Sequence, residues 1–203
     1  MSQPSRRAPR PNRRSRRPTW RWGPAAVTAA AIALGAAVLV VATNTKTTAR
    51  TNLVTDQAAA PDGQFTTIKG TTTSVRALRG QAILLWFVTT FCGSCQAGTQ
   101  AVSANIDQFT HQHVKVVELE LADNLGGSGP DIASFAAANA KTSLANPNWV
   151  WGTASQQLTT TYDPGSYLDI YYLIDPAGHV VYANSSPDAT MSPLLGHVRA
   201  LTA

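Results

Sequence analysis

Residues 83–95 read Ile-Leu-Leu-Trp-Phe-Val-Thr-Thr-Phe-Cys-Gly-Ser-Cys, and this stretch decides the fold. An apolar run of strand type ends in a Cys-x-x-Cys pair, Cys92 and Cys95, and a helix-prone segment follows at once. The chain has no other cysteine. The N-terminus of a helix carries partial positive charge and unpaired N–H groups, which favour a thiolate. The second cysteine follows one helical turn later, within reach of a disulfide, so the stretch predicts a redox site.

Charge is distributed very unevenly along the chain. The formal net charge is +5, but eight arginines and no acidic residue precede residue 24. Beyond that point, eight Lys/Arg stand against eleven acidic residues, which leaves −3. With 44% hydrophobic and 13% charged residues, the body can bury a core. An Arg-rich tail could bind nucleic acid, but the segment that follows argues against that interpretation.

Residues 24–43 form an uncharged stretch of 20 residues, PAAVTAAAIALGAAVLVVAT. This length spans a bilayer core of roughly 30 Å as a helix. Trp20 and Trp22 lie at its charged end, where interfacial indoles are common, and the arginines hold that end in the cytoplasm. We therefore expect an Arg-rich cytoplasmic tail (residues 1–23), a transmembrane signal anchor (24–43), a flexible linker (44–61) and an extracytoplasmic domain (62–203).

Other interpretations of the N-terminus fit the sequence less well. A soluble helix would show a polar face, and only Thr28 is polar before Thr43. Ser15-Arg16-Arg17 weakly resembles a twin-arginine signal, but its continuation differs. A cleavable signal peptide is disfavoured because no clean small-residue cleavage site is present, and no cysteine follows the run to carry a lipid.

Outside the membrane a cysteine pair tends to be oxidised. The alternative is a purely structural disulfide. A disulfide that closes so short a loop removes little entropy from the unfolded chain, so it would stabilise the fold little and is more plausibly a reactive bond.

The rest of the chain predicts an α/β domain. We expect two short strands around a glycine turn at 65–68 and 71–75, a helical turn at 76–80 and a buried strand at 82–88. A helix is expected over 92–110, a strand over 114–121, a flexible loop over 123–130 and a helix over 131–140. A strand over 148–151, a helix over 153–162, a hairpin over 170–183 and a final helix opening at Ser192-Pro193 complete the order.

Two further groups of polar residues are candidates for chemistry. His111 and His113 could bind a metal, although two imidazoles alone make an incomplete site and such residues are more often solvated. Glu118 and Glu120 share one strand face, where a carboxylate can lie near an active site. A solvent-facing edge is at least as common an explanation for them.

The chain resembles the thioredoxin-like superfamily, and within it the membrane-anchored TlpA/ResA-like thiol-disulfide oxidoreductases. The likeness covers about residues 62–203. It rests on the approach Ser74-Val-Arg-Ala-Leu-Arg-Gly-Gln-Ala-Ile-Leu-Leu-Trp-Phe, on Phe91-Cys-Gly-Ser-Cys and on Tyr172-Leu-Ile-Asp-Pro-Ala-Gly-His-Val-Val. The resemblance implies a three-layer α/β/α fold with an N-terminal β-hairpin extension, preceded here by a single transmembrane helix.

The chain departs from the family pattern at two places. The cis-proline that usually faces the dithiol is missing, because Asp169, or Leu168 with a shift of one residue, stands in its place. The buried acid of thioredoxin falls at Trp86, so Glu118, Glu120 or Asp169 is the candidate replacement as proton acceptor. The expected substrate groove consists of Phe91, Gly93, Ser94, Leu168 and Asp169.

The resemblance implies exchange of a Cys92–Cys95 disulfide with protein thiols and disulfides, without a cofactor or a resident metal. Cys92 attacks, because its position lowers its pKa, and Cys95 resolves the mixed disulfide. A reductase outside the membrane would need a membrane electron donor; no nucleic-acid partner is expected.

The main alternative is a copper-handling chaperone similar to Sco proteins, in which two thiolates hold Cu(I). The spacing is one residue short of the Sco pattern, and Tyr167 falls where a ligand histidine is expected. A peroxidase is a weaker alternative, because no constellation of Thr/Ser-x-x-Cys with arginine stands out. A non-catalytic binding module, which would tolerate serine at both cysteines, is the last one.

Overall fold

A computed structural model describes residues 57–201. Within these residues lies a seven-stranded sheet of order β2-β1-β5-β4-β3-β6-β7. The strands are β1 (Gln64–Thr67), β2 (Thr72–Ser74), β3 (Ala82–Val88), β4 (Val114–Glu120), β5 (Trp149–Ala154), β6 (Asp169–Ile174) and β7 (Val180–Asn184). β3, β4 and β5 are parallel, whereas β1, β6 and β7 each run antiparallel to the neighbour that they join.

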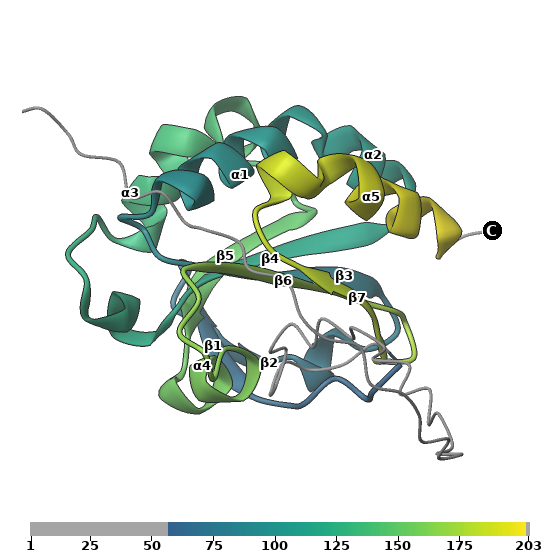
Figure 1. Cartoon of the computed structure of the whole chain (residues 1–203), viewed down its shortest axis with the longest axis horizontal. Coiled ribbons are helices and arrows are strands. Elements are labelled where there is room, and N and C mark those ends of the chain that lie inside the picture. The colour runs from purple at the N-terminus through teal and green to yellow at the C-terminus, as the bar shows by residue number, and fades with distance from the viewer. Residues whose placement is uncertain (1–56, 202–203) are drawn as a thin grey trace, which may run out of the picture. The chain divides into compact units, whose positions relative to one another are not determined.

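Helices cover both faces of this sheet. The α-helices are α1 (Gly93–Ala104), α2 (Ile106–His111), α3 (Ile132–Asn139), α4 (Gln156–Tyr162) and α5 (Pro187–Ala200), with short 3-10 turns at Arg76–Leu78, Ala122–Gly126 and Lys141–Ser143. Figure 1 shows α1, α2, α3 and α5 over one face and α4 over the other. The three-layer architecture expected from the resemblance is therefore present.

Strand β3 supplies side chains to two hydrophobic cores, because alternate residues of a strand point to opposite faces. Leu84, Trp86 and Val88 belong to the core under α1, α3 and α5. Ile83, Leu85 and Phe87 belong to the core under α4. All seven residues of β3 are buried, as its continuous apolar run predicts for a strand covered on both sides.

The folded domain begins before the predicted boundary at residue 62. Ala59 forms a bridge with His179, and backbone hydrogen bonds join Ala60 to Gly178 and Val180 to Ala58. The last residues of the predicted linker therefore lie against the edge of β7. The predicted tail, the anchor and the first part of the linker lie outside the described residues. No helix within residues 57–201 is long and apolar enough to cross a membrane.

Three predicted boundaries are wrong. The helix expected over 92–110 is two helices, because Asn105 leaves helical geometry (φ −115°, ψ 9°) and its side-chain amide donates to the Ala101 carbonyl. The strand expected to end at residue 151 continues to Ala154, and α4 begins only after Ser155, whose hydroxyl accepts from the Leu158 N–H. The final helix begins at Pro187 rather than at Ser192-Pro193, so Pro193 lies inside α5.

The loop after β4 is more regular than its glycine-rich sequence predicts. Asp123, Asn124 and Leu125 all have left-handed backbone angles (φ 50° to 52°), and Gly126 follows with φ 80°. Left-handed conformations cost about 1–2 kcal/mol per residue for side chains other than glycine. Three in succession persist only if other contacts fix them, and the buried side chain of Asn124 supplies such contacts.

Candidate functional site: a dithiol at the start of α1

Cys92 occupies the N-cap position of α1, as the sequence predicts. Its backbone is extended (φ −84°, ψ 128°), and its sulfur accepts a hydrogen bond from the Cys95 N–H at 3.4 Å. The Ser94 hydroxyl lies 3.0 Å from the same sulfur. Burial raises the pKa of the Cys92 thiol, but hydrogen bonds from Cys95 and Ser94 outweigh it, so that the net pKa lies below the usual value. Gly93 and Ser94, which separate the cysteines, are exposed.

Cys95 has the opposite environment. Its side chain is fully buried, and its thiol donates to the carbonyl oxygen of Leu168 at 2.9 Å. Burial strongly raises the pKa of Cys95, and hydrogen bonding to Cys92 and the charge of Asp169 add to the effect. No disulfide joins the two cysteines in this structure. The pair is therefore asymmetric: Cys92 is 7% exposed and its pKa is lowered, whereas Cys95 is fully buried and its pKa is raised.

Asn124 holds the segment that leads into Cys92. The last backbone hydrogen bond between β4 and β3 joins the Leu121 N–H to the Val88 carbonyl. One step further, the Asn124 side chain accepts from the Thr90 N–H at 2.9 Å and donates to the Thr90 hydroxyl at 2.7 Å. The amide side chain thus replaces the next rung of the ladder after β4 has ended, and it fixes the backbone two residues before the nucleophilic position.

Three exposed apolar side chains lie on the segments next to the dithiol, directly before Cys92 and at the carbonyl that accepts from Cys95, and we call them the rim: Phe91, Tyr167 and Leu168. They are 39%, 46% and 41% exposed, and they belong to the few large hydrophobic side chains that the described residues leave exposed. Phe91 lies against Gly127, where an added Cβ would come within 2.0 Å of the ring. Exposed apolar side chains on the segments next to a reactive thiol suit a polypeptide partner better than a small charged one.

Leu168 and Asp169 are the two residues expected at the position of the missing proline, and they make different contacts. The Leu168 carbonyl accepts from both the Thr89 N–H, at 3.0 Å, and the Cys95 thiol. Asp169 is buried at the start of β6, and its Oδ1 accepts from the Trp86 indole N–H at 2.8 Å. Trp86 stands where thioredoxin has its buried acid, and its indole N–H binds another buried acid, Asp169, from the neighbouring strand β6.

The two candidate glutamates lie in different places. Glu118 is fully buried on the same sheet face as the dithiol, and β4 is an interior strand of the sheet. The alternative explanation, a solvent-facing edge strand, is therefore wrong for Glu118. Burial raises the pKa of Glu118 well above its usual value, although a hydrogen bond with Thr99 lowers it. Glu120 is half-buried; burial and the charge of Asp131 raise its pKa, and it faces the start of α3. The structure brings Glu118, but not Glu120, close to α1.

Thr89 is a residue that the sequence reasoning missed. It stands three residues before Cys92, so the Thr-x-x-Cys half of a peroxidase-type constellation is present, and its buried hydroxyl has no hydrogen-bond partner. The arginines among residues 57–201 lie elsewhere: Arg76 pairs with Asp62, Arg79 lies beside Gly178, and Arg199 is near the end of α5. The arginine half of the constellation is not brought to Cys92.

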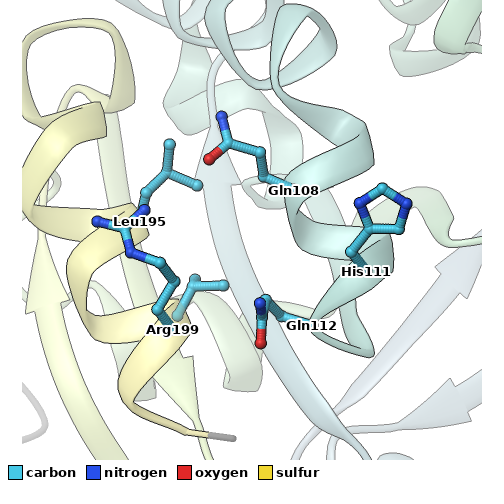
Figure 2. Close-up of a pocket in the computed structure, with 6 residues that line it drawn as sticks. Gln108, His111, Gln112, Leu195 and Arg199 are labelled. Atoms are coloured by element: carbon cyan, nitrogen blue, oxygen red, sulfur yellow. The ribbon is translucent and has the colours of Figure 1, made fainter. Parts of the chain in front are cut away.

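The histidines lie at the other end of the helical layer. His111 lines a pocket of about 110 Å³ between α2 and α5, together with Gln108 and Arg199, as Figure 2 shows. His113 lines a different hollow with Gln81 and Pro176. In the described part of the chain, no three His, Cys, Asp or Glu side chains are grouped to hold a metal. The structure therefore does not bring the two histidines to one site.

A reactive dithiol at the start of a helix, next to a mixed sheet covered on both faces, defines the thioredoxin-like class. Residues 56–183 match the AhpC/TSA family, and the chain belongs to that family. A comparison with curated proteins found no match. The resemblance inferred from the sequence is confirmed at the level of fold and family, and with it the oxidoreductase class.

Solved structures of two kinds share this fold. A protein assigned as thiol:disulfide interchange protein DsbE from Chlorobium tepidum has a TM-score of 0.60 at 17% identity, covering 74% of this chain and 99% of its own. BsSco, of the Sco family of cytochrome c oxidase assembly proteins, has 0.56 at 17% identity, with 72% and 94% covered. Copper-bound ScoI from Arabidopsis thaliana has 0.52 at 16% identity, with 70% and 99% covered.

Proposed function

We propose that this protein is an extracytoplasmic thiol-disulfide oxidoreductase that exchanges a Cys92–Cys95 disulfide with protein substrates. The observation that carries the proposal is the asymmetry of the dithiol. The pKa of Cys92 is lowered at the N-cap of α1, whereas Cys95 is fully buried behind it and its pKa is raised. An attacking thiolate and a resolving thiol need these two environments.

The reaction follows from the order in which the sulfurs become nucleophiles. The Cys92 thiolate attacks one sulfur of a substrate disulfide, and the other substrate sulfur leaves as a thiolate. Cys95 then loses its proton and attacks Cys92, which releases the second substrate thiolate. The substrate gains two electrons and the protein becomes oxidised; the reverse sequence oxidises a dithiol substrate through the same atoms. No cofactor takes part.

The proposed location rests on the N-terminal sequence. Residues 24–43 are uncharged, and eight arginines precede them, which is the pattern of a signal anchor with its N-terminus in the cytoplasm. A reductase so placed draws electrons from a membrane partner. Protease added to intact spheroplasts should degrade the C-terminal domain; its protection until the membrane is lysed would contradict the location.

The activity is tested with the full-length protein in detergent and a disulfide-bonded polypeptide substrate. Cys92→Ser should abolish exchange, and Cys95→Ser should accumulate a mixed disulfide with the substrate, because the resolving step is lost. Full exchange by Cys92→Ser would refute the proposal. The matched control is Ser103→Ala. It removes a hydroxyl of α1 that lies away from the dithiol and donates to the Ala140 carbonyl.

Copper handling is the second candidate, because Sco proteins are among the structures that share the fold. The residues do not complete a copper site here. Tyr167 is an exposed rim residue rather than a ligand histidine, and among the described residues no third His, Cys, Asp or Glu side chain is grouped with the cysteines to hold a metal. A Cu(I) titration distinguishes the candidates: tight, stoichiometric binding with negligible exchange would favour the copper function.

A further inference from the structure

Lysine and arginine side chains gather at one end of the sheet. Residues 57–201 contain six of them. Five lie at the edge where the parallel strands β3, β4 and β5 begin, opposite the edge that leads to Cys92, and we call this edge the basic end: Lys69, Arg79, Lys115, Lys141 and Arg199.

The fold brings these five residues to the basic end from distant parts of the chain. Lys115 is the second residue of β4, and Arg79 precedes β3, beside Gly178 in the turn between β6 and β7. Lys69 lies in the turn between β1 and β2, which is held near the start of β5 by a hydrogen bond from the Ile68 N–H to the Trp151 carbonyl. Lys141 and Arg199 lie where α3 and α5 end, so sequence separation hides the grouping.

Acidic residues show the opposite distribution. The dithiol edge, where β3 and β4 end, carries Glu120, Asp123, Asp131, Asp169 and Asp188. The sixth basic residue, Arg76, pairs with Asp62 at 3.4 Å. The basic end contains only two of the acidic residues that the structure describes, Asp107 and Asp175, so five positive charges stand against two negative ones.

The stabilisation of helix ends explains only part of this grouping. A cation near the C-terminus of a helix is favourable, which accounts for Lys141 and Arg199. Lys69 and Lys115, in a turn and in a strand, have no α-helix end to stabilise. Among residues 57–201, no ion pair involves Lys69, Arg79, Lys115 or Lys141. These charges therefore contribute little within the domain and are available to a partner.

The chain enters the described domain at the same end. The Gln57 N–H donates to the Val180 carbonyl, and the Val180 N–H donates to the Ala58 carbonyl at 2.9 Å. Val180 pairs with Ile174 on β6, and Ile174 pairs with Ile83 on β3. Ile83 in turn pairs with Lys115. The first described residue is therefore level with Lys115 across the sheet, and the dithiol lies a strand length further on.

We propose that the basic end docks on the headgroups of anionic lipids, so that the dithiol edge faces away from the bilayer, towards soluble disulfide substrates. The proposal rests on the proposed membrane anchor and adds the orientation of the site. Only residues 44–56 separate the predicted anchor from Gln57, and 13 residues span at most roughly 45 Å when fully extended. A domain that is entered at its basic end on so short a linker stays within reach of the lipid surface.

Both ends of the domain favour this orientation. Lys and Arg clusters are attracted to anionic lipids close to the surface, whereas the acidic dithiol edge is repelled by them. Gln108, His111 and Arg199 line the pocket between the C-terminal ends of α2 and α5, so N–H donors for a headgroup phosphate also lie at the basic end (Figure 2). The attraction should weaken at high salt, because the Debye length falls.

The test uses full-length protein in nanodiscs of phosphatidylcholine, with and without one third phosphatidylglycerol. Amide hydrogen exchange in segments 68–71 and 140–146 should slow by at least about fivefold with phosphatidylglycerol, the factor for attraction of one Lys or Arg, and should recover at high salt. Loop 123–130 at the dithiol edge should not change. The rate of Cys92 with the neutral disulfide 2,2′-dithiodipyridine should be the same in both nanodiscs.

Variants separate specific docking from general charge. Lys69, Arg79 and Lys141 are exposed, so their combined replacement by glutamine should abolish the protection without lowering the melting temperature. Arg79→Gln alone should reduce it. Arg76→Gln is the matched control, because it removes an exposed arginine three residues away that pairs with Asp62, and it should leave the protection intact.

Equal exchange in both lipids, protection of loop 123–130 instead of the basic end, or equal losses in Arg76→Gln and Arg79→Gln would overturn the proposal. Slower reaction of Cys92 in the anionic nanodiscs would also overturn it, since the dithiol would then face the lipid. Release of the full-length protein from phosphatidylcholine vesicles by alkaline carbonate would instead refute the anchor, and the docking proposal with it.

Discussion

Replacing Asn124 by alanine should destabilise the domain markedly, although the residue lies in a loop. The substitution leaves the Thr90 N–H buried and unpaired, which costs about 1–3 kcal/mol. Alanine at φ 52° adds about 1 kcal/mol, since only glycine, asparagine and aspartate tolerate this region well. The expected loss in the free energy of unfolding is therefore about 2–4 kcal/mol.

Two companion variants separate these contributions. Asn124→Gly removes the hydrogen bonds but accepts the left-handed backbone, so it should cost about 1 kcal/mol less than Asn124→Ala. Thr90→Val removes only the hydroxyl that accepts from Asn124 and keeps the backbone N–H bonded, so its cost should be about 1 kcal/mol.

The assay is urea denaturation of the full-length protein in detergent, followed by the fluorescence of the buried tryptophans 86, 149 and 151. At about 2–4 °C per kcal/mol for a domain of this size, Asn124→Ala should also lower the melting temperature by about 4–16 °C. A loss under about 0.5 kcal/mol is within the range of neutral surface substitutions. It would refute the argument that the Asn124 side chain takes the place of a backbone hydrogen bond between β4 and β3. Equal losses in Asn124→Gly and Asn124→Ala would refute the strain contribution alone.

Three other outcomes follow from the structure. Burial raises the pKa of Asp163 to about 6, so its stabilising contribution is complete below the unfolded pKa of about 3.9 and is lost as pH rises through 6; Asp163→Asn should therefore raise the melting temperature more at pH 7.5 than at pH 4. Gly127→Ala should displace the Phe91 ring and raise KM with little loss of stability, because the ring can move into solvent. Gly129→Ala should instead lower the melting temperature clearly, because its Cβ would meet the Phe91 backbone nitrogen at 3.0 Å. Burial raises the pKa of Glu118 well above its usual value, so its ionisation at high pH costs stability that Glu118→Gln would not lose; the variant's free energy of unfolding should therefore gain relative to the unmutated protein as pH rises from 4, and an equal pH dependence in both would contradict this.

The dithiol and the strand before it could be predicted because their signals are local. The apolar run 82–88 matches β3 at both ends, and Cys92 lies at the N-cap where the motif places it. Asp131 likewise caps α3 as its sequence indicates. Each of these depends on a few consecutive residues, for which periodicity and capping preferences suffice.

The supporting contacts could not be predicted because they join distant segments. Trp86 and Asp169 are 83 residues apart, and Thr90 and Asn124 are 34 apart. Asp169 reaches Trp86 only because β6 runs antiparallel to β3, so that the start of β6 lies at the edge where β3 ends. The left-handed turn after β4 was hidden too, since the glycine-rich sequence indicates a flexible loop and gives no sign that Asn124 anchors it.

The low exposure of the attacking sulfur limits which partners can react with it. Cys92 is only 7% exposed, and hydrogen bonds fix the segments that carry the rim: the Thr90 N–H donates to Asn124 Oδ1 and the Tyr167 N–H donates to Asp163 Oδ1. A flat protein surface cannot bring a disulfide into line with such a sulfur. The deformation needed for reaction must come from the partner, which therefore has to present its cysteine on a protruding, unfolded or easily unfolded segment.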